Sequence, residues 1–101
     1  MNYRNPKLLR LSRGKPCMAR IPGVCNANPE TTVAAHSNSL RHGKGKGIKA
    51  HDCFAAWMCS ACHTEVDQSP RLSREERQEI WQLAFERTIQ AAFQSGAVTI
   101  A

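Results

Sequence analysis

The segment Cys59-Ser60-Ala61-Cys62-His63-Thr64-Glu65-Val66-Asp67 decides how this chain folds. Two thiols separated by two residues have the spacing of half a tetrahedral zinc site. His63 adjoins the second thiol and Asp67 lies four positions later, so a helix would present both on one face. One short segment can therefore hold a structural metal and aim two further ligand-type side chains at a second metal.

A second pair of cysteines, Cys17 and Cys25, lies upstream. The Pro22-Gly23 pair between them favours a turn that would bring both thiols back to one metal. Their spacing is long for a zinc knuckle, but the four thiols together predict a four-cysteine structural zinc site. Buried free cysteines, which pack as small hydrophobic groups, are the alternative, and Cys53 is assigned to that class.

Composition limits the class of protein. The chain has 101 residues, which fits one domain, and a formal net charge of +6. Lysine and arginine are concentrated before Asp52, which indicates a polyanionic partner such as nucleic acid, although a basic surface can also serve solubility alone. No apolar stretch suits a secretory signal or a membrane span. We therefore expect a cytoplasmic protein with reduced, metal-binding thiols and no membrane partner.

Three segments are expected along the chain. Residues 1–15 form a basic arm, partly disordered until it meets a partner. Residues 16–69 are poor in large apolar side chains, so a metal would have to supply part of the missing core. Residues 70–101 form a helix and tail that pack on the same domain.

The predicted elements give an α+β fold. Strands are expected over residues 31–36 and 53–58, followed by a short helix over about 60–68. A Ser-x-x-Glu capping box at 73–76 opens a long helix whose apolar side chains share one broad face. A last strand is expected over 98–100. The fold would be a small zinc-stapled core with a long C-terminal helix.

Histidine and aspartate residues are the catalytic candidates. His63 and Asp67 could share a divalent metal and leave positions open for phosphate and water, although a surface His–Asp pair is the ordinary alternative. His36 ends the first strand, where it could deprotonate a water for attack on phosphorus or serve only as a half-buried structural histidine. Asp52 could hydrogen-bond His36 and fix its tautomer, or cap a strand.

The segment between the two strands is rich in glycine and basic residues. Glycines let a backbone approach a ligand closely. Basic side chains hold phosphates without reading base sequence, in a salt-sensitive way. The residues predicted to do so are Arg41, Lys44, Lys46 and Lys49.

Together these motifs resemble the HNH, or ββα-metal, nuclease superfamily, and especially its small phage and prophage members of the YbcO type. The matching stretches are CMARIPGVC at 17–25, NPET at 28–31, AH at 35–36 and CSACHTEVD at 59–67. The resemblance implies a divalent-metal-dependent DNA endonuclease that leaves 5′-phosphate and 3′-hydroxyl ends. It implies structural Zn²⁺ on the four cysteines, a general base at His36, and catalytic Mg²⁺ or Mn²⁺ on His63 and Asp67.

Two positions depart from the pattern of that superfamily. Ala35 stands where many members have an aspartate or histidine ligand, and the middle asparagine has no counterpart in 52–58, where Asp52 is nearest. The catalytic metal site would therefore have fewer protein ligands than is usual in the superfamily. Either His42 or His51 completes it, or the enzyme is weak or inactive.

Two other functions fit the sequence. A non-catalytic, zinc-binding nucleic-acid module explains the thiols and the charge without any convergence of histidines. A phage-encoded adaptor would use the helix over 73–95 to bind a host protein. The expected partners are DNA or RNA, a phage or host recombination or repair protein, and a second copy of the chain, in a bacterial host cell.

Overall fold

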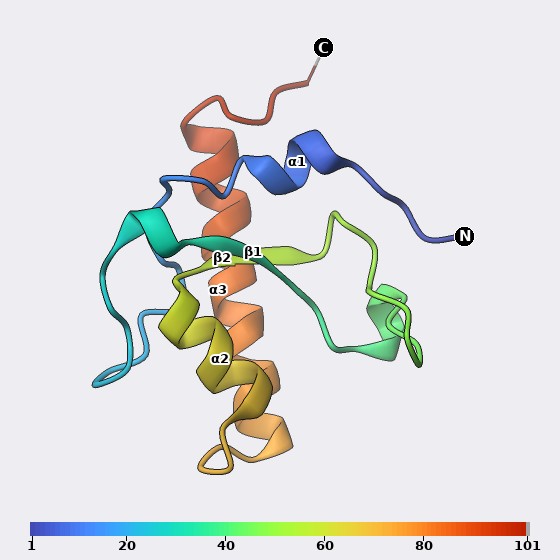
Figure 1. The fold of residues 1–101 in the computed structure, drawn as a ribbon. Coiled ribbons are helices and arrows are strands. Elements are labelled where there is room, and N and C mark those ends of the chain that lie inside the picture. The colour runs from blue at the N-terminus through green and yellow to red at the C-terminus, as the bar shows by residue number, and fades with distance from the viewer. Residues whose placement is uncertain (101) are drawn as a thin grey trace.

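A short antiparallel pair of strands lies at the centre of the fold (Figure 1). The computed structural model describes residues 1–100 and pairs β1 (Val33–His36) with β2 (Ala55–Met58). Both strands start two residues later than predicted. Pro29–Thr31 instead forms a 3-10 turn, η1, capped by Asn28, and a turn closed by the backbone bond from Phe54 to His51 precedes β2.

Two helices pack against this pair of strands. The short helix α2 (Ser60–Gln68) follows β2 almost directly and has the predicted bounds. The long helix α3 (Arg74–Gln94) crosses the hairpin and packs against β2 (Figure 1). Their contact surfaces form the apolar core, whose buried members include Met18, Ala35, Ala56, Trp57, Met58, Val66, Trp81, Ala84 and Ala92.

Side-chain hydrogen bonds fix α3 in place. Its predicted capping box is present, with Ser73 Oγ accepting from the Glu76 N–H and Glu76 accepting from the Ser73 N–H. The Trp81 indole donates to the Ala35 carbonyl at 2.9 Å, and Thr88 Oγ1 accepts from the Trp57 N–H at 2.9 Å. Each bond satisfies a buried polar group, so α3 is tied to both strands.

The two ends of the chain differ from the prediction. Residues 1–15 are not a free arm, because Asn5 caps a short helix, α1 (Pro6–Arg10), and Arg4 contacts the buried Asp52. No strand forms over 98–100 of the described chain. Instead the Val98 N–H donates to the Ala92 carbonyl and returns the chain onto the core after α3. Within residues 1–100, no helix is both long and apolar enough to cross a bilayer.

Candidate metal centre and active site

Four cysteine side chains converge where β2 runs into α2. The Sγ atoms of Cys17, Cys25, Cys59 and Cys62 all lie within 4.8 Å of one another. Zn–S bonds of about 2.3 Å in a tetrahedron require sulfurs about 3.8 Å apart, and Cys25 and Cys59 are 3.9 Å apart. Cys53 is exposed and lies outside the group. These four thiols fit one zinc ion, which they could hold between three segments of the chain.

Local backbone structure positions the thiols. Cys59 is the N-cap of α2, and its Sγ accepts from the Cys62 N–H. The other pair is brought back by the predicted turn, in which the Cys25 N–H donates to the Ile21 carbonyl at 2.9 Å. Gly23 adopts φ 75° at this turn, a conformation that favours glycine.

Two of the thiols differ in acidity. Burial opposes ionisation of Cys59, but backbone N–H groups of Cys62 and Asn26 outweigh it and lower the pKa of Cys59 to about 7. Burial raises the pKa of Cys62. Metal binding requires thiolates, so uptake of zinc would release a proton from Cys62 at neutral pH.

His63 and Asp67 form an ion pair on the outer face of α2. The His63 Nε2 lies 3.0 Å from Asp67 Oδ2, and both side chains are more than a third exposed. The hydrogen bond with Asp67 raises the pKa of His63 against the effects of burial and of the Lys49 charge. Burial opposes ionisation of Asp67, but the partners of its carboxylate outweigh burial and lower its pKa.

The His63–Asp67 pair has a third member, Asn38, that the sequence did not indicate. Its Nδ2 donates to Asp67 Oδ1 at 3.2 Å. Asn38 follows β1 by two residues, and only its place just beyond a strand end could have drawn attention to it. Neighbouring octahedral ligands about 2.1 Å from a metal are about 3.0 Å apart, so the 3.0 Å between His63 Nε2 and Asp67 Oδ2 is the spacing of two adjacent ligands as well as that of an ion pair.

His36, the last residue of β1, and Asp52 form a second pair. The His36 Nε2 is 2.8 Å from Asp52 Oδ1, as predicted, and the two side chains are 15% and 3% exposed. The Asp52 carboxylate also accepts from the Asn5 N–H and from Arg4. Burial opposes ionisation of Asp52, but these partners outweigh it and lower the pKa of the carboxyl group. With the proton on Nε2, His36 Nδ1 is left to accept.

The structure does not join these two pairs directly. Within residues 1–100, no hydrogen bond or ion pair links His36 or Asp52 to His63 or Asp67. Asp67 lines a large groove, whereas Asp52 lines a small apolar cavity of about 180 Å³ that also contacts α1. Among the described residues, the four cysteines are the one group of three or more ligand-type side chains close enough to share a metal.

Neither of the two remaining histidines completes the His63 site. The His42 ring stacks on Phe54 with ring centroids 4.2 Å apart, and its Nδ1 lies 2.6 Å from Ser37 Oγ. Burial, followed by the charge of Arg41, lowers the pKa of His42. His51 Nδ1 accepts from the Tyr3 N–H at 2.8 Å. Both rings therefore serve the packing of the segment between the strands.

The predicted phosphate-binding side chains all lie on this segment. Arg41 is in the 3-10 turn η2 (Leu40–His42) and lines the large groove. Lys44 and Lys46 flank Gly45, which forms an isolated bridge with Ile48. Lys49 is exposed, and its carbonyl accepts from Asn2 and Arg4. Within residues 1–100, none of the four predicted side chains forms an ion pair.

Comparison with known proteins shows which family has this combination of a cysteine cluster, a pair of strands and a long helix. A family model described as "Putative nuclease YbcO" matches residues 6–97. The chain belongs to the YbcO family. The predicted resemblance to YbcO-type proteins is thus confirmed at the level of the family.

Individual YbcO relatives agree with this placement. "Putative nuclease YbcO" of Escherichia coli (strain K12) and "Putative nuclease ybcO" of Enterobacteria phage 82 are each 51% identical over 61 residues, or 60% of this chain. The match spans 62% of the length of each relative. A solved structure described as a putative bacteriophage protein from E. coli str. K-12 substr. MG1655 is 35% identical, with a TM-score of 0.67. It is similar over 87% of this chain and 98% of that chain.

Proposed function

We propose that this YbcO-family chain is a divalent-metal-dependent endonuclease of the HNH type that hydrolyses phosphodiester bonds in DNA. The observation that carries the proposal is the His63–Asp67 pair, whose 3.0 Å separation suits two ligands of one hard metal ion. Asp67 lines a groove that also contains arginine side chains. The description of the family model, "Putative nuclease YbcO", supports nuclease activity in general.

The metal-binding residues have separate tasks in this proposal. His63 and Asp67 hold Mg²⁺ or Mn²⁺, which when bound neutralises charge on the scissile phosphate. Asn38 holds Asp67 by its second carboxylate oxygen, and such outer partners orient the ligands of a metal. The four thiols hold zinc for structure alone and fix the first turn of α2, from which His63 projects.

His36 acts as the general base in the proposed reaction. Asp52 accepts a hydrogen bond from the Nε2–H of His36, so the lone pair on Nδ1 is available for a proton from the attacking water. The buried carboxylate then stabilises the imidazolium that forms. This assignment requires the scissile phosphate to contact both pairs. Arg41, Lys44, Lys46 and Lys49 hold neighbouring phosphates.

One observation favours a second candidate function, a zinc-binding nucleic-acid module without catalysis. Ala35 occupies the position of a superfamily ligand and is only 2% exposed, packed in the core. Two protein ligands, His63 and Asp67, therefore remain for a catalytic metal. In this alternative the four cysteines bind zinc, the basic segment binds nucleic acid, and the two histidine–aspartate pairs only stabilise the fold.

A plasmid assay distinguishes the two functions. Zinc-loaded protein is incubated with supercoiled plasmid in buffer alone, with Mg²⁺ and with Mn²⁺, and nicked product is tested for resealing by DNA ligase. We expect metal-dependent nicking that ligase reverses, lost in His36→Ala and kept in His51→Ala, which removes an imidazole outside both pairs. Binding of DNA and RNA without turnover in either metal would favour the non-catalytic module.

A further inference from the structure

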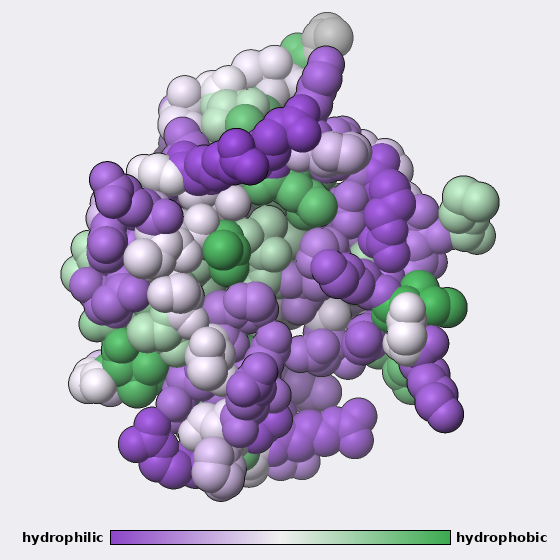
Figure 2. Space-filling model, viewed as in Figure 1, coloured by the Kyte–Doolittle hydropathy of each residue, from purple (hydrophilic) through white to green (hydrophobic). Residues whose placement is uncertain are grey.

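The groove beside Asp67 is larger than the proposed metal site needs. It has a volume of about 1240 Å³ and lies between three segments: residues 37–42, the end of α2 and the first half of α3. Figure 2 shows a largely hydrophilic surface where α2 ends and α3 begins. The sequence predicts only that this helix packs on the core domain, so its contribution to an open polar surface is new.

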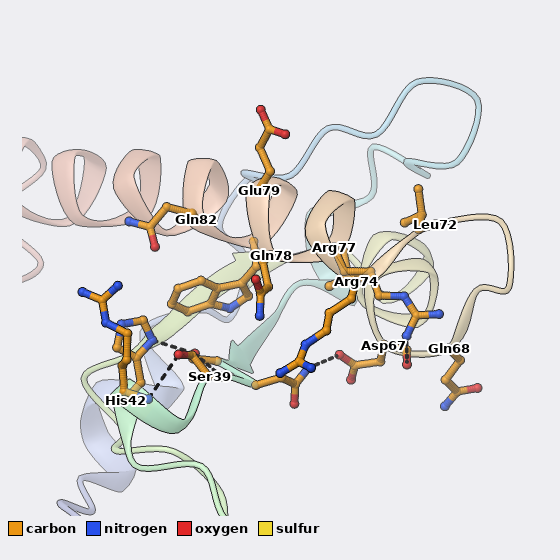
Figure 3. A pocket seen from close by; sticks show the side chains of 15 residues that line it. Ser39, His42, Asp67, Gln68, Leu72, Arg74, Arg77, Gln78, Glu79 and Gln82 are labelled. Carbon is orange, nitrogen blue, oxygen red and sulfur yellow. Dashed lines mark hydrogen bonds between the residues drawn. The ribbon is translucent and has the colours of Figure 1, made fainter.

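Helix α3 contributes a polar row to this groove. Arg74, Gln78 and Gln82 recur every four residues, and all three are exposed and line the groove. In Figure 3, Arg74 and Gln78 point toward the same hollow as Asp67. Glu79 also lines the groove, but its side chain extends in a different direction from those of Arg74 and Gln78. Arginine and glutamine offer several N–H donors each, as a phosphodiester backbone requires.

Two of the arginine side chains that line the groove form no ion pair with the rest of the described chain. These two are Arg41 and Arg74, which lie on different segments. Arg77 differs, because its guanidinium donates to the carbonyls of Asp67 and Ser69 and so secures the end of α2. Two free guanidinium groups thus remain for an anionic ligand.

The floor of the groove excludes one common mode of nucleic-acid binding. Trp81 lines it but is only 6% exposed, and its indole N–H already donates to the Ala35 carbonyl. It cannot offer the open aromatic face on which bases stack. The available contacts are therefore charge and hydrogen bonding to the backbone of the ligand.

We propose that this groove binds the phosphodiester backbone of the nucleic-acid strand that flanks the scissile phosphate, through Arg74 and Gln78 of α3 and Arg41 opposite. The inference rests on the proposed nuclease function for its direction, since Asp67 lies in the same groove. It adds the first half of α3 to the binding surface and makes binding independent of base sequence.

Binding measured without cleavage tests the groove separately from the nuclease. Fluorescein-labelled single-stranded and duplex DNA of mixed sequence are titrated with zinc-loaded protein in the absence of Mg²⁺ and Mn²⁺, and anisotropy is followed from 50 to 300 mM salt. The variants are Arg74→Gln and Arg41→Gln. Arg13→Gln is the matched control, because it removes the same charge from an exposed side chain outside the groove.

Each phosphate contact adds about 0.9 to the magnitude of the slope when the logarithm of the association constant is plotted against the logarithm of salt concentration for duplex DNA. For single-stranded DNA it adds about 0.7. We therefore expect each groove variant to weaken binding about fivefold to eightfold near 0.1 M salt and to reduce the slope by that amount, on whichever DNA the groove accepts. Arg13→Gln should match the wild type.

Equal affinities and salt slopes for the wild type and both groove variants, on both DNAs, would overturn the proposal that the groove binds DNA. This holds even if the protein cleaves plasmid. Loss of binding in both variants with no cleavage by the wild type would support the groove and reject the nuclease.

Discussion

At the scale of single residues, Asp52 links three parts of the molecule. Its buried carboxylate accepts from His36, from the Asn5 N–H and from Arg4. The histidine–aspartate contact was predictable, because both residues stood out in the sequence. The contacts to Arg4 and Asn5 were not, since nothing local shows that a basic N-terminal segment will fold back on a carboxylate 47 or 48 positions away.

Asp52→Asn should lower the free energy of unfolding at pH 7 by about 1–3 kcal/mol, because buried partners lose their charged acceptor. The folded-state pKa of Asp52 is below its ordinary value. Its contribution is therefore present above the unfolded pKa of about 3.9 and disappears as pH falls through the folded pKa. Urea unfolding from pH 7 to pH 3 should show the wild-type and variant curves converging below about pH 4.

The exposed Glu86→Gln is the control for Asp52→Asn and should change stability by less than about 0.5 kcal/mol. A difference between wild type and Asp52→Asn that stayed constant down to pH 3 would show that the carboxylate charge contributes nothing.

Asn38→Ala should weaken the proposed catalytic metal site without removing a ligand. Asp67 would lose the donor that holds its second oxygen, and loss of such outer partners costs about 10–100-fold in metal affinity or activity. Plasmid nicking against Mn²⁺ concentration should therefore need about tenfold more metal or higher for half-maximal rate. The same half-maximal concentration in both proteins would remove Asn38 from this role.

At the scale of elements, features set by neighbouring residues could be predicted from the sequence, whereas features set by contacts between distant segments could not. The bounds of α2 and the start of α3 follow from caps at Cys59 and Ser73, which act within one helical turn. Both strands are shorter than predicted because turns occupy their first residues. Asn38 and the groove side of α3 were missed because each depends on contacts between segments that the sequence separates.

The cysteine cluster should behave as one element joined by metal. Cys25→Ser replaces a half-buried thiol of the cluster and should abolish stoichiometric zinc binding and lower the melting temperature. Cys53→Ser, an exposed thiol outside the cluster, should keep about one zinc per chain, as a four-cysteine site requires, and the wild-type melting temperature. Zinc content by mass spectrometry and thermal unfolding check both. Equal zinc content in the two variants would contradict the four-thiol site.

At the scale of the whole molecule, a small core is accompanied by a four-cysteine cluster and the long helix α3. Many buried members of that core are alanine, cysteine or methionine, so a metal held by the four thiols would add, together with the long helix, stabilisation that larger buried side chains would otherwise give. The same domain carries two histidine–aspartate pairs and a groove lined in part by arginine side chains. The proposed enzyme would use both pairs on one phosphate.

The most direct test of metal-dependent cleavage compares the wild type with His63→Ala and with Thr64→Ala, an exposed neighbour on α2. Nicking of supercoiled plasmid in Mg²⁺ and Mn²⁺ is measured on samples whose zinc content and melting temperature are also recorded. We predict that wild type and Thr64→Ala nick the plasmid and His63→Ala does not, while all three hold about one zinc and unfold at similar temperatures. Cleavage by His63→Ala at the wild-type rate, or no cleavage by zinc-loaded wild type, would contradict the proposed nuclease.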